Sequence, residues 1–367
     1  MGDSALPLVV DSLLEPHQRD LIARFGLVMA PETETVHVRS MARFGFSTAK
    51  LFVTHFDESM AGRPFVVKVD ELEAYERERT AIANLLVYFV DADVHYYKHK
   101  DYGAIAYPLQ KSGSGQIETF EDALSLPTGT DERLCTALKQ VYGGCCRIAH
   151  NAKKVDTRKL GEEYLRYHRS AKTDNDLCRA LGNTFDREPF DFYGEKIVDP
   201  RAAKQVLDSR EFDITVGPIH GDLHGSNIVF DEEDRPHLID FAWGDRSGHV
   251  MKDFVMLENS LRFFAFPRYF DPDIHARVDS ALLVENGVDL VRELATDTPL
   301  EAEYMRLASL VEIIRDAARA AGGDSFFDEY LLAQFMILYR LLQYPTYPFH
   351  ATLRSLGGLG QHILATV

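Results

Sequence analysis

Two carboxylates and one amide stand in this chain at positions that suit phosphate chemistry. Asp222 and Asn227 belong to the segment HGDLHGSN, a polar loop between apolar segments. Asp240 ends the short apolar strand HLI and precedes Phe241. Because a loop held by two strands brings its ends together, we expect an acid, an amide and a second acid to lie close to one another.

Transfer of a phosphoryl group from ATP requires such a set. One carboxylate must orient the attacking hydroxyl and accept its proton, and hard oxygen ligands must hold Mg2+ against the phosphates. Asp222 suits the first role, and Asn227 and Asp240 suit the second. The sequence therefore predicts a magnesium-dependent phosphotransferase site.

A zinc site is the alternative for the same segment, with His220, Asp222 and His224 as ligands. The two histidines are four residues apart, as in HExxH, but they lie on a glycine-containing loop instead of a helix. No further ligand is evident in the sequence. His224 is better interpreted as a residue that packs within the loop.

The segment HGDLHGSN followed by IDF resembles the HGDxHxxN…IDW/F motif of the aminoglycoside phosphotransferase and choline kinase family, relatives of the protein kinases. The step of five residues from Asp222 to Asn227 is also similar to the kinase pattern HRDxxxxN. The resemblance implies that Asp222 is the catalytic base and that Asn227 and Asp240 bind Mg2+. One departure is Ala242, which stands where the kinase DFG motif has glycine.

The resemblance also assigns supporting roles around the loop. It implies that His220 and Gly221 shape the loop and that Asp253, in GHVMKDF, buttresses it. The pattern is similar, too, to kinase-like modules carried by some large bacterial conflict proteins, which leaves the phosphate acceptor open.

A lysine and a glutamate in the N-terminal part provide an independent check. Lys68 alternates with Val67 and Val69 in the strand PFVVKVD, and it resembles the VAIK lysine that contacts ATP phosphates in kinases. The helix that follows has an apolar face on which Glu78 lies at the edge, whereas Glu76 falls about a quarter-turn outside it. Because a buried carboxylate needs a cation, we choose Glu78 as the partner of Lys68, with Glu76 in reserve.

Two further nucleotide contacts are expected from the resemblance. Gly45 and Ser47 lie in a turn that would cover the phosphates, although the turn offers one glycine where kinases have GxGxxG. Leu109 would donate its backbone N–H to adenine, because Pro108 beside it has no N–H.

The elements that must position these residues divide into two lobes. Residues 12–26 are predicted to be helical, and 35–71 to form three antiparallel strands. A helix over 71–87 and two strands, VHYYK and YGAIAYPL, complete a small β-rich lobe. The flexible segment KSGSG is a linker or hinge, and the resemblance puts the hinge near Tyr107, Pro108 and Leu109. The predicted domains are an N-terminal helical extension (1–34), a small lobe (35–110) and a large lobe (111–367).

Beyond residue 118 the pattern is mostly helical, interrupted by a β-like stretch at 214–241. The expected helices cover 119–126, 131–151, 157–170, 174–184, 200–211, 249–264, 275–286, 301–321 and 325–343. The predicted fold is therefore α+β, with a bilobal, protein-kinase-like architecture whose cleft would hold the ligand.

Composition limits the partners. The formal net charge is −17, which argues against nucleic acid and mildly favours a cationic acceptor. No apolar run is long enough for a transmembrane helix, and the acidic N-terminus does not suit a signal peptide. The four cysteines form no CxxC pair. We expect a cytoplasmic protein that binds neither nucleic acid nor membranes; its oligomeric state is left open.

The function predicted from the sequence is transfer of the γ-phosphoryl group of ATP, with GTP as a possible substitute and Mg2+ as cofactor, to a hydroxyl of a small molecule. An aminoglycoside-like, amino-alcohol or sugar acceptor would fit. The alternatives are a protein kinase, disfavoured by the short segment between Asp240 and Asp253, and a nucleotide-binding pseudokinase that serves as a regulatory module.

Overall fold

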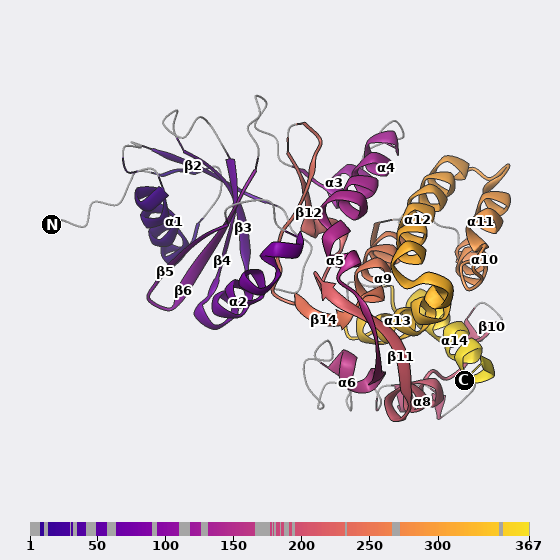
Figure 1. Ribbon diagram of the computed structural model, residues 1–367. Helices are drawn as coiled ribbons and strands as arrows, with labels where there is room; N and C mark the ends of the chain where they lie inside the picture. Colours follow the sequence, from indigo (N-terminus) through magenta and orange to yellow (C-terminus); the bar gives the residue numbers. More distant parts are fainter. Residues whose placement is uncertain are drawn as a thin grey trace.

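The structure, a computed structural model, describes residues 8–10, 14–29, 31, 35–41, 49–56, 64–89, 94–109, 118–125, 131–165, 177, 179, 181–183, 185, 186, 191, 192, 195–231, 233–265, 272–344 and 348–366. Figure 1 shows a small lobe built on one sheet and a larger lobe that consists mostly of helices. The α+β, bilobal fold predicted from the sequence is confirmed.

The small lobe contains a six-stranded sheet with the order β1-β2-β3-β4-β6-β5. β1 pairs with β2 in parallel, and the other neighbours are antiparallel. The strands are β1 (Leu8–Val10), β2 (Val36–Ser40), β3 (Lys50–Phe56), β4 (Pro64–Glu71), β5 (His95–His99) and β6 (Tyr102–Pro108).

Two helices cover the two faces of this sheet: α1 (Pro16–Met29) and α2 (Leu72–Phe89). Successive side chains of a strand point to opposite faces. Phe65, Val67 and Val69 of β4 accordingly join the apolar cluster under α1, whereas Val66 joins the cluster that contains α2 residues. Lys68 therefore points to the α2 face.

The predicted strands of this lobe and the helix near 71–87 are confirmed in type and order. The helix expected at 12–26 is instead α1, which starts at Pro16 and runs through Gly26 to Met29. Gly26 is buried in that helix and does not end it, because packing on the sheet outweighs its low helix propensity. The KSGSG segment lies outside the described residues.

The strands of the large lobe form three short sheets, ordered β14-β11-β8, β13-β12-β7 and β10-β9. Their bounds are β7 (Glu118–Thr119), β8 (Lys154–Lys159), β9 (Asp191–Phe192), β10 (Glu195–Lys196), β11 (Glu211–Ile219), β12 (Ile228–Phe230), β13 (Pro236–Leu238) and β14 (Asp245–His249). The β12–β13 hairpin carries the candidate metal ligands at its open end.

Helices make up the rest of the large lobe (Figure 1). They are α3 (Phe120–Leu124), α4 (Asp131–Gln140), α5 (Arg147–Asn151), α6 (Leu160–Leu165), α8 (Arg201–Ser209), α9 (Met251–Ser260), α10 (Pro272–Ala281), α11 (Gly287–Ala295), α12 (Glu301–Gly322), α13 (Phe326–Leu341) and α14 (Phe349–Thr366). Short π-helical turns at Val141–Cys145 and Leu261–Ala265 and 3-10 turns at Gly225–Asn227 and Gly323–Ser325 extend or join them.

One expectation for this lobe was wrong, and two helices were missed. Residues 154–159 form the edge strand β8, paired with β11, where a helix was expected from 157. The helices α11 and α14 were not expected at all. The segment of 174–184 is helical at the five residues that the structure describes in it.

The apolar core of the large lobe lies between α9, α12 and α13, and nearly every side chain of α9 and α13 is buried. This core is continuous with the residues under α2, so one apolar core extends through both lobes. Among the described residues, no helix combines the length and apolarity needed to cross a membrane.

Candidate active site

Lys68 makes two short ion pairs on the α2 face of the small-lobe sheet. Its Nζ lies 2.6 Å from Oε2 of Glu78 and 2.7 Å from Oδ1 of Asp240, and all three side chains are buried. Burial alone would lower the pKa of Lys68, but the carboxylates of Asp240 and Glu78 raise it above its ordinary value. Lys68 therefore stays protonated and could bind a phosphate group.

The structure distinguishes the two candidate glutamates. Glu78 is 1% exposed and faces the sheet, whereas Glu76 pairs at the surface with Lys98 at 2.8 Å and with Arg79 at 3.1 Å. Burial raises the pKa of Glu78, and the charge of Lys68 opposes that rise. Glu78 is the geometric partner of Lys68, as the helical spacing predicted.

Tyr107 joins this pair to the large lobe. Its hydroxyl donates to Oε1 of Glu78 and accepts the backbone N–H of Asp240 at 3.2 Å. Burial raises the pKa of Tyr107 well above its ordinary value, so the hydroxyl stays protonated and remains a donor. Tyr107 was predicted only to lie near the hinge, although its strand period puts it on the same face as Lys68.

Asp253 of α9 holds the loop that follows β11, which begins at His220. Its two carboxylate oxygens accept the backbone N–H groups of His220 and Gly221, each at 2.7 Å. Gly221 has φ +83°, a conformation that favours glycine. His220 contacts the Ile239 carbonyl oxygen through Nε2 at 2.9 Å, which ties the loop to the strand before Asp240.

Hydrogen bonds join Asn227 to Asp222 and to the residue before Asp240. The Asn227 side-chain amide donates to the Asp222 carbonyl oxygen at 2.8 Å, and the backbone carbonyl of Asn227 accepts the Ile239 N–H at 3.1 Å. The second bond extends the β12–β13 pairing and places Asn227 beside the residue that precedes Asp240. His224 lies within the loop, with Nε2 3.2 Å from the same Asn227 amide nitrogen.

Asp240 has a left-handed backbone, with φ +66°. A non-glycine residue takes this conformation only where its surroundings impose it. Here the ion pair with Lys68 and the bond to Tyr107 fix both its side chain and its N–H. The backbone turns sharply at the end of the strand and directs the carboxylate toward the small lobe.

The donor set suits a hard cation. Asn227 and Asp240 supply an amide oxygen and a carboxylate, which are ligands that Mg2+ prefers. Because the nitrogen of the Asn227 amide donates to Asp222, its oxygen points the other way. In the part of the chain that the structure describes, no group of three or more His, Cys, Asp or Glu side chains could hold a metal ion.

Three further residues were expected to contact the nucleotide: Gly45, Ser47 and Leu109. Gly45 and Ser47 lie outside the described residues. The N–H of Leu109 donates to the Pro64 carbonyl at 2.9 Å and continues the pairing between β4 and β6. This donor is engaged within the small lobe, so we leave Leu109 out of the proposed site.

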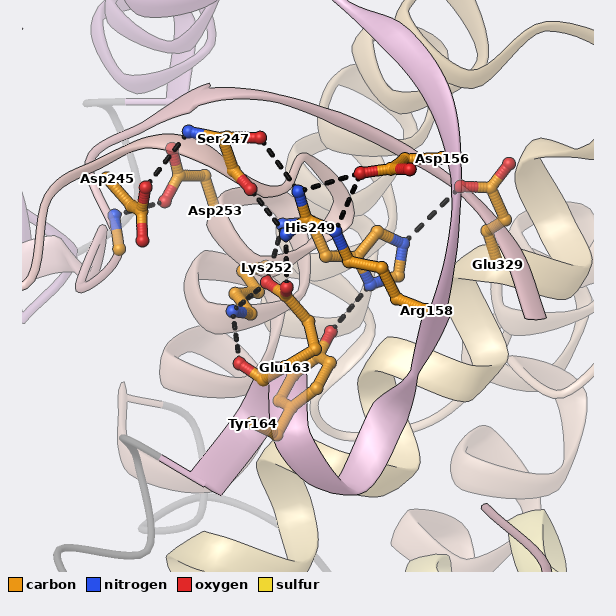
Figure 2. A network of polar contacts seen from close by, with 11 residues as sticks. Asp156, Arg158, Glu163, Tyr164, Asp245, Ser247, His249, Lys252, Asp253 and Glu329 are labelled. Atoms are coloured by element: carbon orange, nitrogen blue, oxygen red, sulfur yellow. Dashed lines mark hydrogen bonds and ion pairs between the residues drawn. The ribbon is translucent and has the colours of Figure 1, made fainter. Parts of the chain in front are cut away.

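A buried polar network supports the helix that carries Asp253 (Figure 2). Glu163 of α6 accepts from Lys252 of α9 and from Arg158 of β8, each at 2.6 Å, and from the backbone of His249 at 2.9 Å. Burial would raise the pKa of Glu163, but these cations lower it below its ordinary value. The network thereby fixes α9 against β8 and β14.

The same network continues from His249 to α13. The Tyr164 hydroxyl lies 2.8 Å from Nδ1 of His249, and Nε2 of the same ring lies 3.4 Å from Oε2 of Glu329 (Figure 2). Glu329 also accepts the backbone N–H of Thr215 in β11 at 2.6 Å. Burial lowers the pKa of His249, which keeps the ring neutral. The loop is thus anchored to a rigid part of the large lobe.

One further residue near the candidate base escaped the sequence analysis. Arg340 of α13 places Nη1 3.9 Å from Oδ1 of Asp222. The sequence does contain an indication of this residue, a single arginine within the apolar run FMILYRLL. Arginine is rarely buried in a helix unless it is paired.

Comparison with known proteins gives one family match and several similar solved structures. A family model described as Ternary complex associated domain 9 matches residues 151–342. No protein of curated function matches the chain in sequence.

Solved structures similar to the chain include three small-molecule kinases and phosphotransferases. The choline kinase LicA from Streptococcus pneumoniae is 13% identical, with 94% of this chain and 99% of that chain covered and a TM-score of 0.46. A choline kinase from Cryptosporidium parvum is 11% identical (90% and 88% covered, TM-score 0.40). An aminoglycoside phosphotransferase from Alicyclobacillus acidocaldarius is 16% identical (89% and 91% covered, TM-score 0.31).

Proposed function

The chain belongs to the family described as Ternary complex associated domain 9, and we propose that it is an ATP- and Mg2+-dependent phosphotransferase that acts on a hydroxyl of a small molecule. The observation that carries the proposal is the 2.7 Å contact between Lys68 and Asp240, which joins a small-lobe cation to a carboxylate of the catalytic segment. Asn227 and Asp222 lie on the same segment, joined at 2.8 Å.

In this proposal the nucleotide phosphates bind between the lobes. Lys68 contacts them, and Glu78 and Tyr107 hold the lysine in place. Asn227 and Asp240 would hold Mg2+, which when bound neutralises charge on the phosphates. Residues anchored in this way act chiefly by positioning and by electrostatic stabilisation, which supply most of the catalysis in phosphoryl transfer.

Asp222 is the proposed proton acceptor. Its carboxylate would orient the acceptor hydroxyl toward the γ-phosphorus and take the proton as the new P–O bond forms and the bond to ADP breaks. The ties of the loop to Asp253 and Ile239 hold its backbone in one conformation. The products are ADP and the phosphorylated acceptor.

A small-molecule acceptor fits the segment after Asp240 better than a protein does. Residues 245–249 form β14, which pairs with β11, and α9 starts at Met251. This short connection leaves no chain for a long activation loop before Asp253, and such loops position protein substrates in protein kinases.

The test is ATP-dependent phosphorylation of a panel of hydroxyl compounds, followed by 31P NMR and ADP release. The wild type should phosphorylate at least one compound in Mg2+ and none in EDTA. Asp222→Asn should bind ATP with nearly unchanged affinity and turn over at least 100-fold more slowly, whereas normal turnover in this variant would remove Asp222 from the mechanism. GTP in place of ATP establishes the nucleotide preference in the same assay.

A further inference from the structure

Arg340 is a buried cation beside the proposed proton acceptor. Its side chain is 6% exposed, and Nη1 lies 3.9 Å from Oδ1 of Asp222. This separation allows an ion pair but is too long for a hydrogen bond. Because a guanidinium stays charged at any physiological pH, a permanent positive charge stands next to the position of the reacting hydroxyl.

Two aromatic rings orient the guanidinium. Its central carbon is 5.4 Å from the ring centroid of Trp243 and 5.6 Å from that of Tyr344, and Nη2 donates to the Tyr344 hydroxyl at 3.4 Å. Trp243 follows Asp240 by three residues, so the support comes from the catalytic segment itself. Cation–π contacts of this kind hold a planar cation in a defined orientation.

We propose that Arg340 recognises the acceptor, and that the acceptor is a small hydroxyl compound with a carboxylate or phosphate close to the hydroxyl that is phosphorylated. This inference rests on the proposed function. A fixed guanidinium can bind either group through two parallel hydrogen bonds. It repels an ammonium group at the same position, which disfavours a cationic acceptor.

The net charge of −17 does not oppose this inference. Surface charges are screened over about 8 Å at physiological ionic strength, whereas Arg340 would act by direct contact. The charge of Arg340 beside Asp222 therefore determines the charge of the acceptor more strongly than the net charge of the protein does.

The γ-phosphoryl group is the other possible partner of Arg340. A contact with that group would assist every acceptor by the same factor, because the same γ-phosphoryl group is transferred in each case. A contact with the acceptor would assist only anionic ones, so the charge of the acceptor separates the two roles.

The experiment uses sets of compounds that differ in charge: glycerol, glycerate and 2-aminopropane-1,3-diol, and glucose, glucose 6-phosphate and glucosamine. Binding is measured as the shift in melting temperature with Mg2+ and ADP present, and transfer from ATP is followed by 31P NMR. We expect the anionic member of at least one set to give the largest shift and a kcat/KM at least tenfold above the neutral one. Equal shifts, or larger shifts with neutral or cationic members in both sets, overturn the proposal.

Three variants add a control for charge and shape. Arg340→Gln should reduce the preference for the anionic compound to within about twofold, and Arg340→Lys should restore only part of it, because lysine lacks the planar fork. Arg319→Gln, at an exposed arginine of α12 that pairs with Asp316, should behave like the wild type. A folded Arg340→Gln protein that keeps the preference, or that loses neutral and anionic turnover equally, contradicts the assignment.

Failure of the inference and failure of the proposed function remain distinguishable. A wild type that transfers phosphate to none of the compounds speaks against the phosphotransferase, while its melting shifts still decide whether the site selects anions. If Arg340→Gln does not fold, the charge series on the wild type decides alone.

Discussion

The Nζ atom of Lys68 lies 2.7 Å from Oδ1 of Asp240, so that two residues 172 positions apart in the chain form one buried ion pair across the two lobes. Each residue is held separately, Lys68 by Glu78 and Asp240 by the hydroxyl of Tyr107. The pair marks the point where a polyphosphate would meet both lobes.

The pairing of Lys68 with Glu78 predicts different effects of two neighbouring substitutions. Glu78→Gln removes the charge that holds Lys68, and we expect kcat/KM for ATP to fall about 100-fold, as when a positioning group is displaced. Glu76→Gln alters only surface pairs and should stay within twofold of the wild type. Steady-state kinetics of the two variants measure this, and equal losses would show that Lys68 does not depend on Glu78.

Tyr107 predicts a coupled loss of stability and activity. Tyr107→Phe removes the donor to Glu78 and the acceptor for the Asp240 N–H, so the free energy of unfolding should fall by about 1–3 kcal/mol. Turnover should fall about tenfold. Tyr96→Phe is the matched control, because the buried Tyr96 hydroxyl makes no hydrogen bond among the described residues. Urea unfolding and ATP turnover that are the same in both variants would contradict a bridging role.

Asp253 should matter more to turnover than to folding. In Asp253→Asn one oxygen can still accept a backbone N–H, but the amide nitrogen cannot accept the other, so the loop at His220 and Gly221 loses one of its two ties. We expect turnover to drop at least tenfold with a loss of about 1–3 kcal/mol in stability. Asp316→Asn, at the surface of α12, is the control. A variant with wild-type turnover would show that the loop needs only one tie.

A second buried network predicts the acid sensitivity of the large lobe. Glu258 pairs with Arg315 at 2.9 Å and with Arg262 at 3.0 Å, and Tyr330 donates to it at 2.7 Å. Burial alone would raise the pKa of Glu258, but Arg315 and Arg262 lower it from its ordinary 4.5 to about 2. The folded state thus holds this proton less readily than the unfolded state does.

The stability contributed by Glu258 is therefore complete above pH 4.5 and is lost as the pH falls toward 2. Glu258→Gln should lower the free energy of unfolding at pH 7 by about 3–5 kcal/mol, because it leaves two buried arginines without this carboxylate. It should also flatten the dependence of stability on pH between those values. Glu312→Gln, at a half-exposed surface pair with Arg292, should change stability by less than about 1 kcal/mol. If the free energy of unfolding of Glu258→Gln depended on pH as steeply as that of the wild type, Glu258 would not be the source of the acid sensitivity.

Local periodicity was enough to predict β2 to β6 and α2, and it selected Glu78 over Glu76 as the partner of the lysine that the resemblance required. The strand period sends Lys68 to one face of β4, and the helical period sends Glu78 to the facing side of α2. The position of Asn227 beside the residue before Asp240 was predictable for the same reason, because a short hairpin, β12–β13, determines it.

The features that were not predicted from the sequence depend on contacts between distant segments. β8 is a strand because it pairs with β11, more than fifty residues away, and its charged side chains resemble those of an exposed helix. The glycines in α14 argue against a helix, yet a Cβ on Gly357 would lie 2.8 Å from the Val198 carbonyl oxygen, so close packing requires glycine there. Arg340 reaches Asp222 from another element, a proximity that no local pattern encodes.

Binding of ATP with and without Mg2+ tests the central claim most directly, by calorimetric titration of the wild type and of Asp240→Asn. We predict that the wild type binds ATP in Mg2+ and that EDTA or the Asp240→Asn substitution weakens binding at least tenfold. Equal ATP affinity for the wild type in Mg2+, the wild type in EDTA and Asp240→Asn would contradict a nucleotide and metal site between Lys68 and Asp240. The absence of ATP binding by the wild type would contradict it as well.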